Sequence, residues 1–279
     1  MVRALRVLLV LALTVCALPS SVRTLAQSGR APTPATKPTP AQKKTAPAPA
    51  RPVEAIVPFR VGEVLDYDVA WSSFLTAGSA TLTLADKSAA FGSTVYHVVG
   101  EGRPVSLVAR LYTLSYKAET WLDVYTLLPH QGRIYSEEGQ ERQTKTVGFD
   151  QRAHTARFEE SGAPSRQMTV PPLTQDALSA IYALRAQALT PGKKISMPVA
   201  HDENVLTLQI TVDGRETTTC GLGTIPSLKL TPTILDASGT VKTVRALTLW
   251  ISDDARRLPL RMRADLAVGT FDLILREIR

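Results

Sequence analysis

Cysteine is nearly missing from this sequence, which has two cysteines, Cys16 and Cys220, in 279 residues. Cys16 lies in a segment that we expect to be removed, so Cys220 has no partner for a disulfide within the chain. A chain without disulfides must be stabilised by a hydrophobic core, and the 44% of apolar residues can supply one. A single thiol on a strand is most simply a small buried apolar side chain.

The sequence also lacks an apolar run that could span a bilayer as a helix. The run over residues 7–18 is shorter than the roughly 20 apolar residues that a spanning helix needs. Arg3 and Arg6 precede the run and Thr24-Leu25-Ala26 follows it, which is the pattern of a secretory signal peptide. We therefore predict a signal peptide over residues 1–26, no transmembrane anchor after its cleavage, and a periplasmic or secreted location.

No excess of charge remains in the part of the chain that we expect to fold. The formal net charge of +7 comes from residues 1–56, which hold eight basic side chains and one acidic one. Residues 57–279 hold 24 of each sign. Nucleic-acid binding depends on a basic surface, so no nucleic-acid partner is predicted.

Motifs of catalysis and cofactor binding are missing as well. The sequence has no Gly-x-Ser-x-Gly elbow, no phosphate-binding P-loop and no Gly-x-Gly-x-x-Gly fingerprint. The histidines at positions 97, 130, 154 and 201 lack the spacing of a helical metal pair, and no second cysteine completes a zinc site. We therefore predict no catalytic residue, no metal, no cofactor and a non-enzymatic protein.

Carboxylates are the remaining candidates for chemistry, because a glycosidase needs two of them about 5 to 10 Å apart across a cleft. Asp66 and Asp68 share one face of a predicted strand, opposite Tyr67 and Val69, which is typical of a solvated face. A carbohydrate or cell-wall hydrolase therefore stays the alternative. Its candidate residues are Asp66, Asp68, Glu119, Asp123, Asp253 and Asp254.

Residues 27–56 are rich in Pro, Ala, Thr and Lys and contain almost nothing large and apolar. Such a segment cannot bury enough surface to offset its ordering entropy. We predict a disordered, extended linker, which serves either as a simple spacer or as a tether near the membrane or peptidoglycan.

Residues 57–279 have the texture of an all-β protein, with short Val-, Leu-, Thr- and Tyr-rich runs separated by turn residues. The odd positions of residues 65–71 are apolar, and residues 205–212 alternate in the same way. Sheets with one dry and one wet face are antiparallel as a rule. An antiparallel sheet is therefore predicted.

One segment, residues 173–189, has apolar residues at helical spacing instead. Thr174 is the expected N-cap, and Pro191-Gly192 ends the segment, so we predict one helix of about four turns packed on the sheet. The residues expected to share its buried face are Leu178, Ile181, Tyr182, Arg185 and Leu189.

Two segments on either side of this helix look alike. One runs from Trp121 to Pro129 and the other from Trp250 to Pro259, and both are predicted as strand, tight turn, strand. Duplication of one unit is one explanation, and chance similarity of two common hairpins is the other.

Several segments, read in order, carry a resemblance to a known family. They are FRVGEVLDY at 59–67, Trp71, Gly78, DALSAIYALR at 176–185, and LWISDD at 249–254 with Leu258-Pro259. Together they resemble the exported bacterial proteins grouped as domain of unknown function 3108. The resemblance covers about residues 57–279, and it implies an envelope-localised, β-rich domain without an established activity.

A shorter segment, Glu119 to Pro129, is similar to the LolA-type lipoprotein carriers. Their fold is a curved antiparallel half-barrel closed by helices over a lipid-binding hollow. This similarity implies that the helix is a lid and that apolar strand faces line the hollow; the alternative is that the same faces form a filled core. The residues expected to contact a ligand are Trp71, Trp121, Tyr182, Arg185 and Trp250.

The expected fold is therefore mainly β, an antiparallel and strongly curved sheet or half-barrel with one central α-helix, and two pseudo-repeated halves are one option. The expected function is that of an exported periplasmic binding or envelope-assembly protein for a lipid, another apolar ligand or an envelope protein partner. A hydrolase and a structural interaction module without ligand are the alternatives.

Overall fold

The computed structural model describes residues 52–72, 75–105, 114–241, 246–266 and 269–279. The predicted signal peptide and most of the predicted linker lie outside the described residues. The folded unit takes in the chain from Glu54 onward. The Glu54 carboxylate pairs with Lys87 Nζ at 2.6 Å, and the Ala55 N–H donates to the Val124 carbonyl at 2.9 Å.

The described residues form fourteen strands and one helix. Strands dominate because the chain alternates apolar with polar residues and is rich in Val, Leu and Thr, which suit a pleated, half-buried surface. The elements are β1 (Val64–Trp71), β2 (Leu75–Ala90), β3 (Ser93–Pro104), β4 (Leu114–Asp123), β5 (Pro129–Glu138), β6 (Glu141–Asp150), β7 (Thr155–Glu160), β8 (Arg166–Thr169), α3 (Ala177–Arg185), β9 (Lys194–His201), β10 (Asn204–Cys220), β11 (Gly223–Leu235), β12 (Ala246–Ser252), β13 (Pro259–Leu266) and β14 (Gly269–Ile278).

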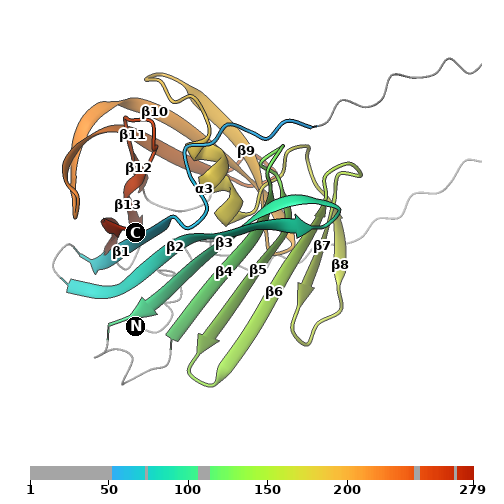
Figure 1. The fold of residues 1–279 in the computed structure, drawn as a ribbon. Coiled ribbons are helices and arrows are strands. Elements are labelled where there is room, and N and C mark those ends of the chain that lie inside the picture. The colour runs from blue at the N-terminus through green and yellow to red at the C-terminus, as the bar shows by residue number, and fades with distance from the viewer. Residues whose placement is uncertain (1–51, 73–74, 106–113, 242–245, 267–268) are drawn as a thin grey trace, which may run out of the picture. The chain divides into compact units, whose positions relative to one another are not determined.

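All fourteen strands belong to one sheet, whose order is β8-β7-β6-β5-β4-β3-β2-β1-β14-β13-β12-β11-β10-β9. The chain starts in the middle of the sheet at β1 and runs outward, strand by strand, to the edge at β8. It then passes through α3 to the opposite edge at β9 and returns to β14 beside β1 (Figure 1). The first and last strands therefore pair at the centre, and the edges come from the middle of the sequence.

The predicted fold class is confirmed, since the sheet is antiparallel, curves around α3 and contains one central helix (Figure 1). The sheet is not closed into a barrel, because β8 and β9 form no ladder with each other in the described part of the chain. We call the place where these two edges face each other the seam.

Ion pairs between side chains and one backbone bridge join the two sides of the seam. Lys145 of β6 pairs with Asp202 at 2.8 Å, and Arg166 of β8 pairs with Glu203. Gln175 lies beside β9 as a single parallel bridge, in which its N–H donates to the Pro198 carbonyl at 2.9 Å. The edges are thus held by ion pairs and one bridge, where the rest of the sheet has continuous backbone ladders.

The predicted helix is confirmed in place but not in length or in its cap. It was expected to start after Thr174 and to run for about four turns, whereas α3 has nine residues and its N-cap is Asp176. Asp176 Oδ1 accepts hydrogen bonds from the backbone N–H groups of Leu178 and Ser179, and the Ser179 hydroxyl accepts one from the Asp176 N–H. This reciprocal capping box satisfies the N–H groups of Asp176, Leu178 and Ser179, whereas Thr174 lies two residues before the position that caps the helix.

The helix is buried on two sides. Leu178 and Tyr182 pack against strands β1 to β4, while Ala180 and Leu184 pack against β9 to β12. A third apolar cluster surrounds Phe271 between β1, β13 and β14. The sequence predicted a single buried face of the helix. The second buried face carries Ala180 and Ala183, and strands β9 to β12 cover it.

The two predicted hairpins are confirmed and share local details. In each, the register shifts directly after the tryptophan, between Trp121 and Leu122 and between Trp250 and Ile251, and the next residue pairs with the proline. The likeness of two hairpins does not decide between duplication and chance, so duplication stays a prediction.

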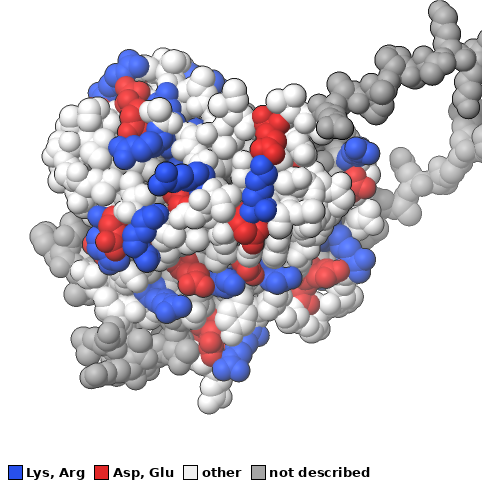
Figure 2. Space-filling view, viewed as in Figure 1, with Lys and Arg blue, Asp and Glu red and all other residues white. Residues whose placement is uncertain are grey.

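Charged side chains of both signs are mixed over the face shown in Figure 2. Basic groups mostly lie beside acidic ones there, which agrees with the balanced charge of residues 57–279. None of the described helices has the length and apolar character required to cross a membrane.

Candidate functional site

The three tryptophans predicted to contact a ligand do not come together. Trp121 faces away from α3, because its neighbours Thr120 and Leu122 are fully buried on the inner face. Trp250 also lies on the outer face, beside the buried Ile251. Trp71 lies at the end of β1 and stacks on Phe271, with ring centroids 6.1 Å apart.

The two outer tryptophans are engaged by other side chains. Trp121 stacks on His97 at 4.8 Å, and the Arg133 guanidinium lies 5.3 Å from its ring centroid. Trp250 Nε1–H donates to Glu216, and Arg261 lies over its ring at 5.4 Å. Both residues therefore stabilise the outer surface of the sheet by stacking and cation–π contacts.

Tyr182 and Arg185 are on α3 but point into the core. Arg185 makes a two-pronged ion pair with Glu63, with Nη1 and Nη2 at 2.6 and 3.0 Å from its two oxygens. Its remaining donors reach the carbonyls of Arg256 and Arg257. Arg185 is therefore fully used in joining the helix to the start of β1, and burial raises the pKa of Tyr182 beside it.

A cavity of about 120 Å³ lies beneath Ile181 of α3, on the inner face of the sheet. Its walls come from both halves, since β1, β2 and β3 contribute to it as well as β12, β13 and β14. Apolar atoms form nearly all of the wall. The larger side chains that line it are Val69, Leu82, Leu249, Met262 and Leu273.

The polar groups at the border of this cavity are already bonded. The Tyr67 hydroxyl donates to the Pro259 carbonyl at 3.0 Å, and burial raises the pKa of this phenol. The side chains of Thr81 and Arg261 are hydrogen-bonded to carboxylates on the outer face of the sheet. The interior of the cavity is therefore suited to apolar atoms.

Small residues create this space. Ala80 of β2 and Gly100 and Gly102 of β3 border the cavity, and Gly100 pairs with Ala118 of β4. Glycine inside a strand weakens the strand and often marks a place where another group approaches closely. Here the missing side chains leave room between the sheet and α3.

A second cavity of about 50 Å³ lies at the N-terminal end of α3, next to the seam. Strands β4 to β7 form one side of it, and the end of β9 forms the other. Its lining is more polar than that of the first cavity. Its lining includes the side chains of Ile134, Lys145, Asp176, His201 and Asp202.

Asp176 reaches this cavity because the sheet leaves room for it at Gly132. A Cβ at Gly132 would lie 3.2 Å from Asp176 Oδ2 and 3.2 Å from a Val147 methyl. Oδ2 also accepts a hydrogen bond from the Thr120 hydroxyl at 2.6 Å. Burial raises the pKa of Asp176 despite these hydrogen bonds, because the carboxyl is completely enclosed.

His201 is the other buried polar group. Its side chain is 10% exposed, and burial lowers its pKa, which favours the neutral imidazole. Nε2 has no hydrogen-bond partner among the described residues, since the Asp202 carboxylate oxygen lies 3.6 Å away. Lys145 and Asp202 beside it neutralise each other.

The family model described as protein of unknown function (DUF3108) matches residues 66–276 of this sequence. The chain belongs to this family. No curated protein matches the DUF3108 chain. The short similarity to LolA-type carriers stays a prediction.

Three solved structures are similar to this DUF3108 protein at low identity. A β-barrel-like protein of DUF1849 from Brucella abortus has 10% identity and a TM-score of 0.48, over 78% of this chain and 97% of the other. A protein described as exported, with YmcC-like fold, from Bacteroides fragilis has 10% identity and a TM-score of 0.34, over 81% and 100%. A protein described as a lipoprotein, from Parabacteroides distasonis, has 8% identity and a TM-score of 0.36, over 81% of this chain and 100% of the other.

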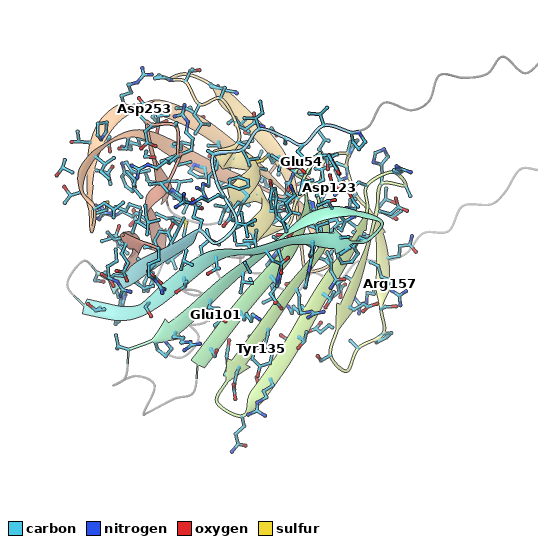
Figure 3. The ribbon with its side chains drawn as sticks, in the orientation of Figure 1. Glu54, Glu101, Asp123, Tyr135, Arg157 and Asp253 are labelled. Carbon is cyan, nitrogen blue, oxygen red and sulfur yellow. The ribbon has the colours of Figure 1, made fainter. Side chains whose placement is uncertain are left out.

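The six carboxylates of the hydrolase alternative are dispersed in this DUF3108 domain. Asp66 and Asp68 face outward on β1, where Arg279 and Arg276 pair with them; Asp66 is only 4% exposed, so its predicted solvated face is partly covered. Figure 3 shows Asp123 and Asp253 in different halves of the sheet.

The remaining carboxylates of that alternative have structural partners too. Glu119 borders the polar cavity but pairs with Lys117 at 3.0 Å, and Asp253 pairs with Arg215 at 2.6 Å. In the described ranges no group of three or more His, Cys, Asp and Glu side chains is placed to hold a metal ion. Of the six, Glu119 alone borders either of the two cavities described above.

Most of the residues that line the two cavities were missed by sequence reasoning, which named Glu119 among them as a candidate carboxylate and Leu178 and Ile181 as residues of the buried helix face. The glycines at 100 and 102 alternate with charged residues, so their common face could have been read as a place without side chains. Lys145, Val147 and Phe149 are two residues apart and share one strand face, so the sequence could have shown a lysine on an apolar face. The glycines and Lys145 lie beneath the same helix only because of the strand order, and no short stretch of sequence indicates that order.

Proposed function

We propose that this DUF3108 protein is an exported, non-enzymatic binding protein that holds the hydrocarbon part of a lipid or another apolar ligand beneath Ile181. The observation that carries the proposal is the apolar cavity of about 120 Å³ between α3 and the sheet. Protein interiors are close-packed, and voids larger than a water molecule are few. We therefore interpret a cavity of this size, bordered by the strand glycines Gly100 and Gly102, as a binding site for an apolar group.

The chemistry of the cavity supports a hydrocarbon occupant. Burying one methylene group contributes about 0.8 kcal/mol, and a dry cavity of roughly 150 Å³ in another protein binds a small aromatic hydrocarbon. The cavity here is of similar size and its polar neighbours are already bonded. Affinity would come from nonspecific burial, which suits a chain of methylene groups.

The predicted address supports a role outside the cytoplasm. The signal-peptide pattern over residues 1–26 and the Pro-rich composition of residues 27–56 suit a protein that is exported and spaced away from a surface. An exported protein whose described part holds an apolar cavity, lined by none of the six candidate carboxylates, suits a binding or envelope-assembly factor.

Native mass spectrometry with lipid extraction tests the proposal on the protein purified after export. We expect a co-purifying apolar ligand on the wild-type chain. Ala80→Leu places a larger side chain in the cavity and should remove most of the ligand, because Ala80 borders it. Ala89→Leu, the same change at an exposed position of β2, should retain the ligand.

A wild-type protein that carries no ligand and binds no fluorescent fatty acid would contradict the proposal. That result would support a structural interaction module, in which the three apolar clusters form a core without a function in binding.

A further inference from the structure

The apolar and polar cavities lie end to end on one row of the sheet. Five inner-face residues are consecutive cross-strand partners from β2 to β6: Leu82, Gly100, Ala118, Ile134 and Lys145. The first two border the apolar cavity and the last three border the polar one. Neighbouring strands are about 4.8 Å apart, so the row spans about 19 Å.

The boundary between the two cavities is built of small groups. On the sheet side it is the Gly100 hydrogen and the Ala118 methyl, which are register partners. On the helix side, Ile181 borders the apolar cavity and Leu178, one turn earlier, borders the polar one. A chain lying along this row from the apolar cavity to Lys145 would pass beneath α3 between Ala118 and Leu178, which belong to one buried cluster and would have to move apart.

The polar end of the row has an unmet hydrogen bond. His201 Nε2 is buried and has no hydrogen-bond partner among the described residues, which is costly in a folded protein. In a neutral imidazole this nitrogen is either a donor or an acceptor, depending on the tautomer. A hydroxyl group both donates and accepts, so it satisfies either tautomer.

The charges around the polar cavity favour a neutral head over an anion. Arg133 and Glu119, which also line it, pair with each other at 3.8 Å. Lys145 is already paired with Asp202 at 2.8 Å, so an anion would compete with Asp202 for the ammonium group. An anion would also lie near the Asp176 carboxyl, which borders the same cavity. A hydroxyl avoids both conflicts, and the cavity of about 50 Å³ accepts only a small group.

Resting on the proposed function, we infer that the polar cavity receives the head of the same ligand and that this ligand is a single-chain amphiphile with a neutral, hydroxylated head, of the chemical class of a monoacylglycerol. The tail lies in the apolar cavity beneath Ile181. The hydroxyl groups contact His201 Nε2 and the Lys145–Asp202 pair.

Three amphiphiles with the same six-carbon acyl chain test the inference: monohexanoylglycerol, methyl hexanoate and hexanoate. The chain is short because cavities of about 120 and 50 Å³ cannot enclose a long one. We offer the delipidated protein an equimolar mixture and measure the bound fractions by native mass spectrometry. Monohexanoylglycerol should bind best, by about fivefold for each hydrogen bond that the others cannot make. His201→Leu and, independently, Lys145→Met should reduce that preference several-fold while methyl hexanoate binding is kept.

Gln209→Leu is the control, because it replaces an exposed polar residue on the adjacent strand by the same apolar one and should keep the preference. Equal binding of the three compounds, a preference for hexanoate, or an unchanged ratio in both His201→Leu and Lys145→Met would overturn the head-group assignment and leave the proposed function standing. Failure of all three compounds to bind would overturn both.

Discussion

Arg185 is the largest fully buried side chain in the described residues, and it shows how a charge can be used in a core. Its guanidinium is matched by both oxygens of Glu63 and by two backbone carbonyls, and it lies 5.3 Å from the Phe59 ring centroid. A buried pair of this kind adds little stability compared with an apolar pair, but breaking it leaves one charge uncompensated. Arg185 thus fixes where α3 lies against the start of β1.

Replacing Arg185 by methionine should therefore be costly. We expect Arg185→Met to lower the free energy of unfolding by about 3 to 5 kcal/mol, because the Glu63 carboxylate would stay buried without a partner. Urea unfolding followed by circular dichroism measures this. Arg157→Met is the control, since Arg157 pairs with Glu159 at the surface and should cost about 0 to 1 kcal/mol. Equal losses in the two variants would contradict this account.

Single residues also show where sequence reasoning stops. Alternation correctly divided residues 65–71 into two faces and put Tyr67 and Val69 on the inner one. Trp121 and Trp250 were expected at a ligand and lie on the outer face, because large apolar residues suit stacking on the outer surface as well as a core. The cap at Asp176, in place of Thr174, depends on Thr120 and Gly132, which lie on strands far away in the sequence.

Among the elements, the edge strands differ most from the rest of the sheet. β8 has four residues and a ladder on one side, and β9 has a ladder on one side and the single bridge to Gln175 on the other. Short edge strands and charged side chains are common devices against edge-to-edge aggregation. Arg166 of β8 pairs with Glu203 in the turn after β9, and Lys145 of β6 pairs with Asp202 in the same turn, so charges lie close to these edges and also join them.

Hydrogen exchange should follow this arrangement. Local openings range from about zero to the full free energy of unfolding, and strands with few partners open first. We expect the amides of β8 and β9 to exchange earliest and those of β1 and β14, in the centre, to exchange last. Exchange mass spectrometry with peptides from each strand measures the order. Protection of β8 equal to that of β1 would show that the seam is as stable as the ladders.

The elements themselves were largely predictable, since the strands, the two tryptophan hairpins and the place of the helix follow from period and turn residues. Their arrangement was not, because period-two alternation does not encode which strand is next to which. The pairing of β1 with β14 depends on contacts between the two ends of the chain. Both cavities depend on that arrangement, so the candidate site could not be assembled from sequence.

At the scale of the whole domain, carboxylates with lowered pKa values dominate the response to pH. Hydrogen bonds from Arg215 lower the pKa of Asp253; in the others burial alone would raise the pKa, but their hydrogen-bond partners together outweigh it. These groups lie in both halves of the sheet. They are Asp66, Glu119, Asp123, Asp253, Asp254 and Asp272.

The domain should consequently lose stability in acid. A carboxyl group with a lower pKa in the folded state stabilises the fold above its unfolded pKa of about 4, and this contribution is lost as the pH falls through the folded pKa. The lowered pKa of His201 adds a smaller loss that begins below about pH 6.5. The raised pKa of Asp176 acts in the opposite direction above about pH 4, because this carboxyl binds a proton more readily in the folded state. Urea unfolding at several pH values should therefore show its steep decline below about pH 4.

Asp272→Asn provides the comparison for this experiment. Its carboxylate accepts hydrogen bonds from both Arg261 and Arg263, so the variant should be less stable near neutral pH and should depend less on pH below about 4. A wild-type stability that stays constant or rises as the pH falls through this range would refute the expectation.

The pairing of the two chain ends has a consequence for how the domain folds. Val64 and Arg279 exchange both backbone hydrogen bonds, at 2.9 Å each, and Asp66 pairs with Arg279 across 213 residues of sequence. Each half of the sheet can form from neighbouring strands, but closing a loop of this length costs chain entropy and makes folding slow. The central ladder therefore forms only when β14 is present, and a chain that ends before β14 leaves the backbone N–H and C=O groups along that edge of β1 unpaired.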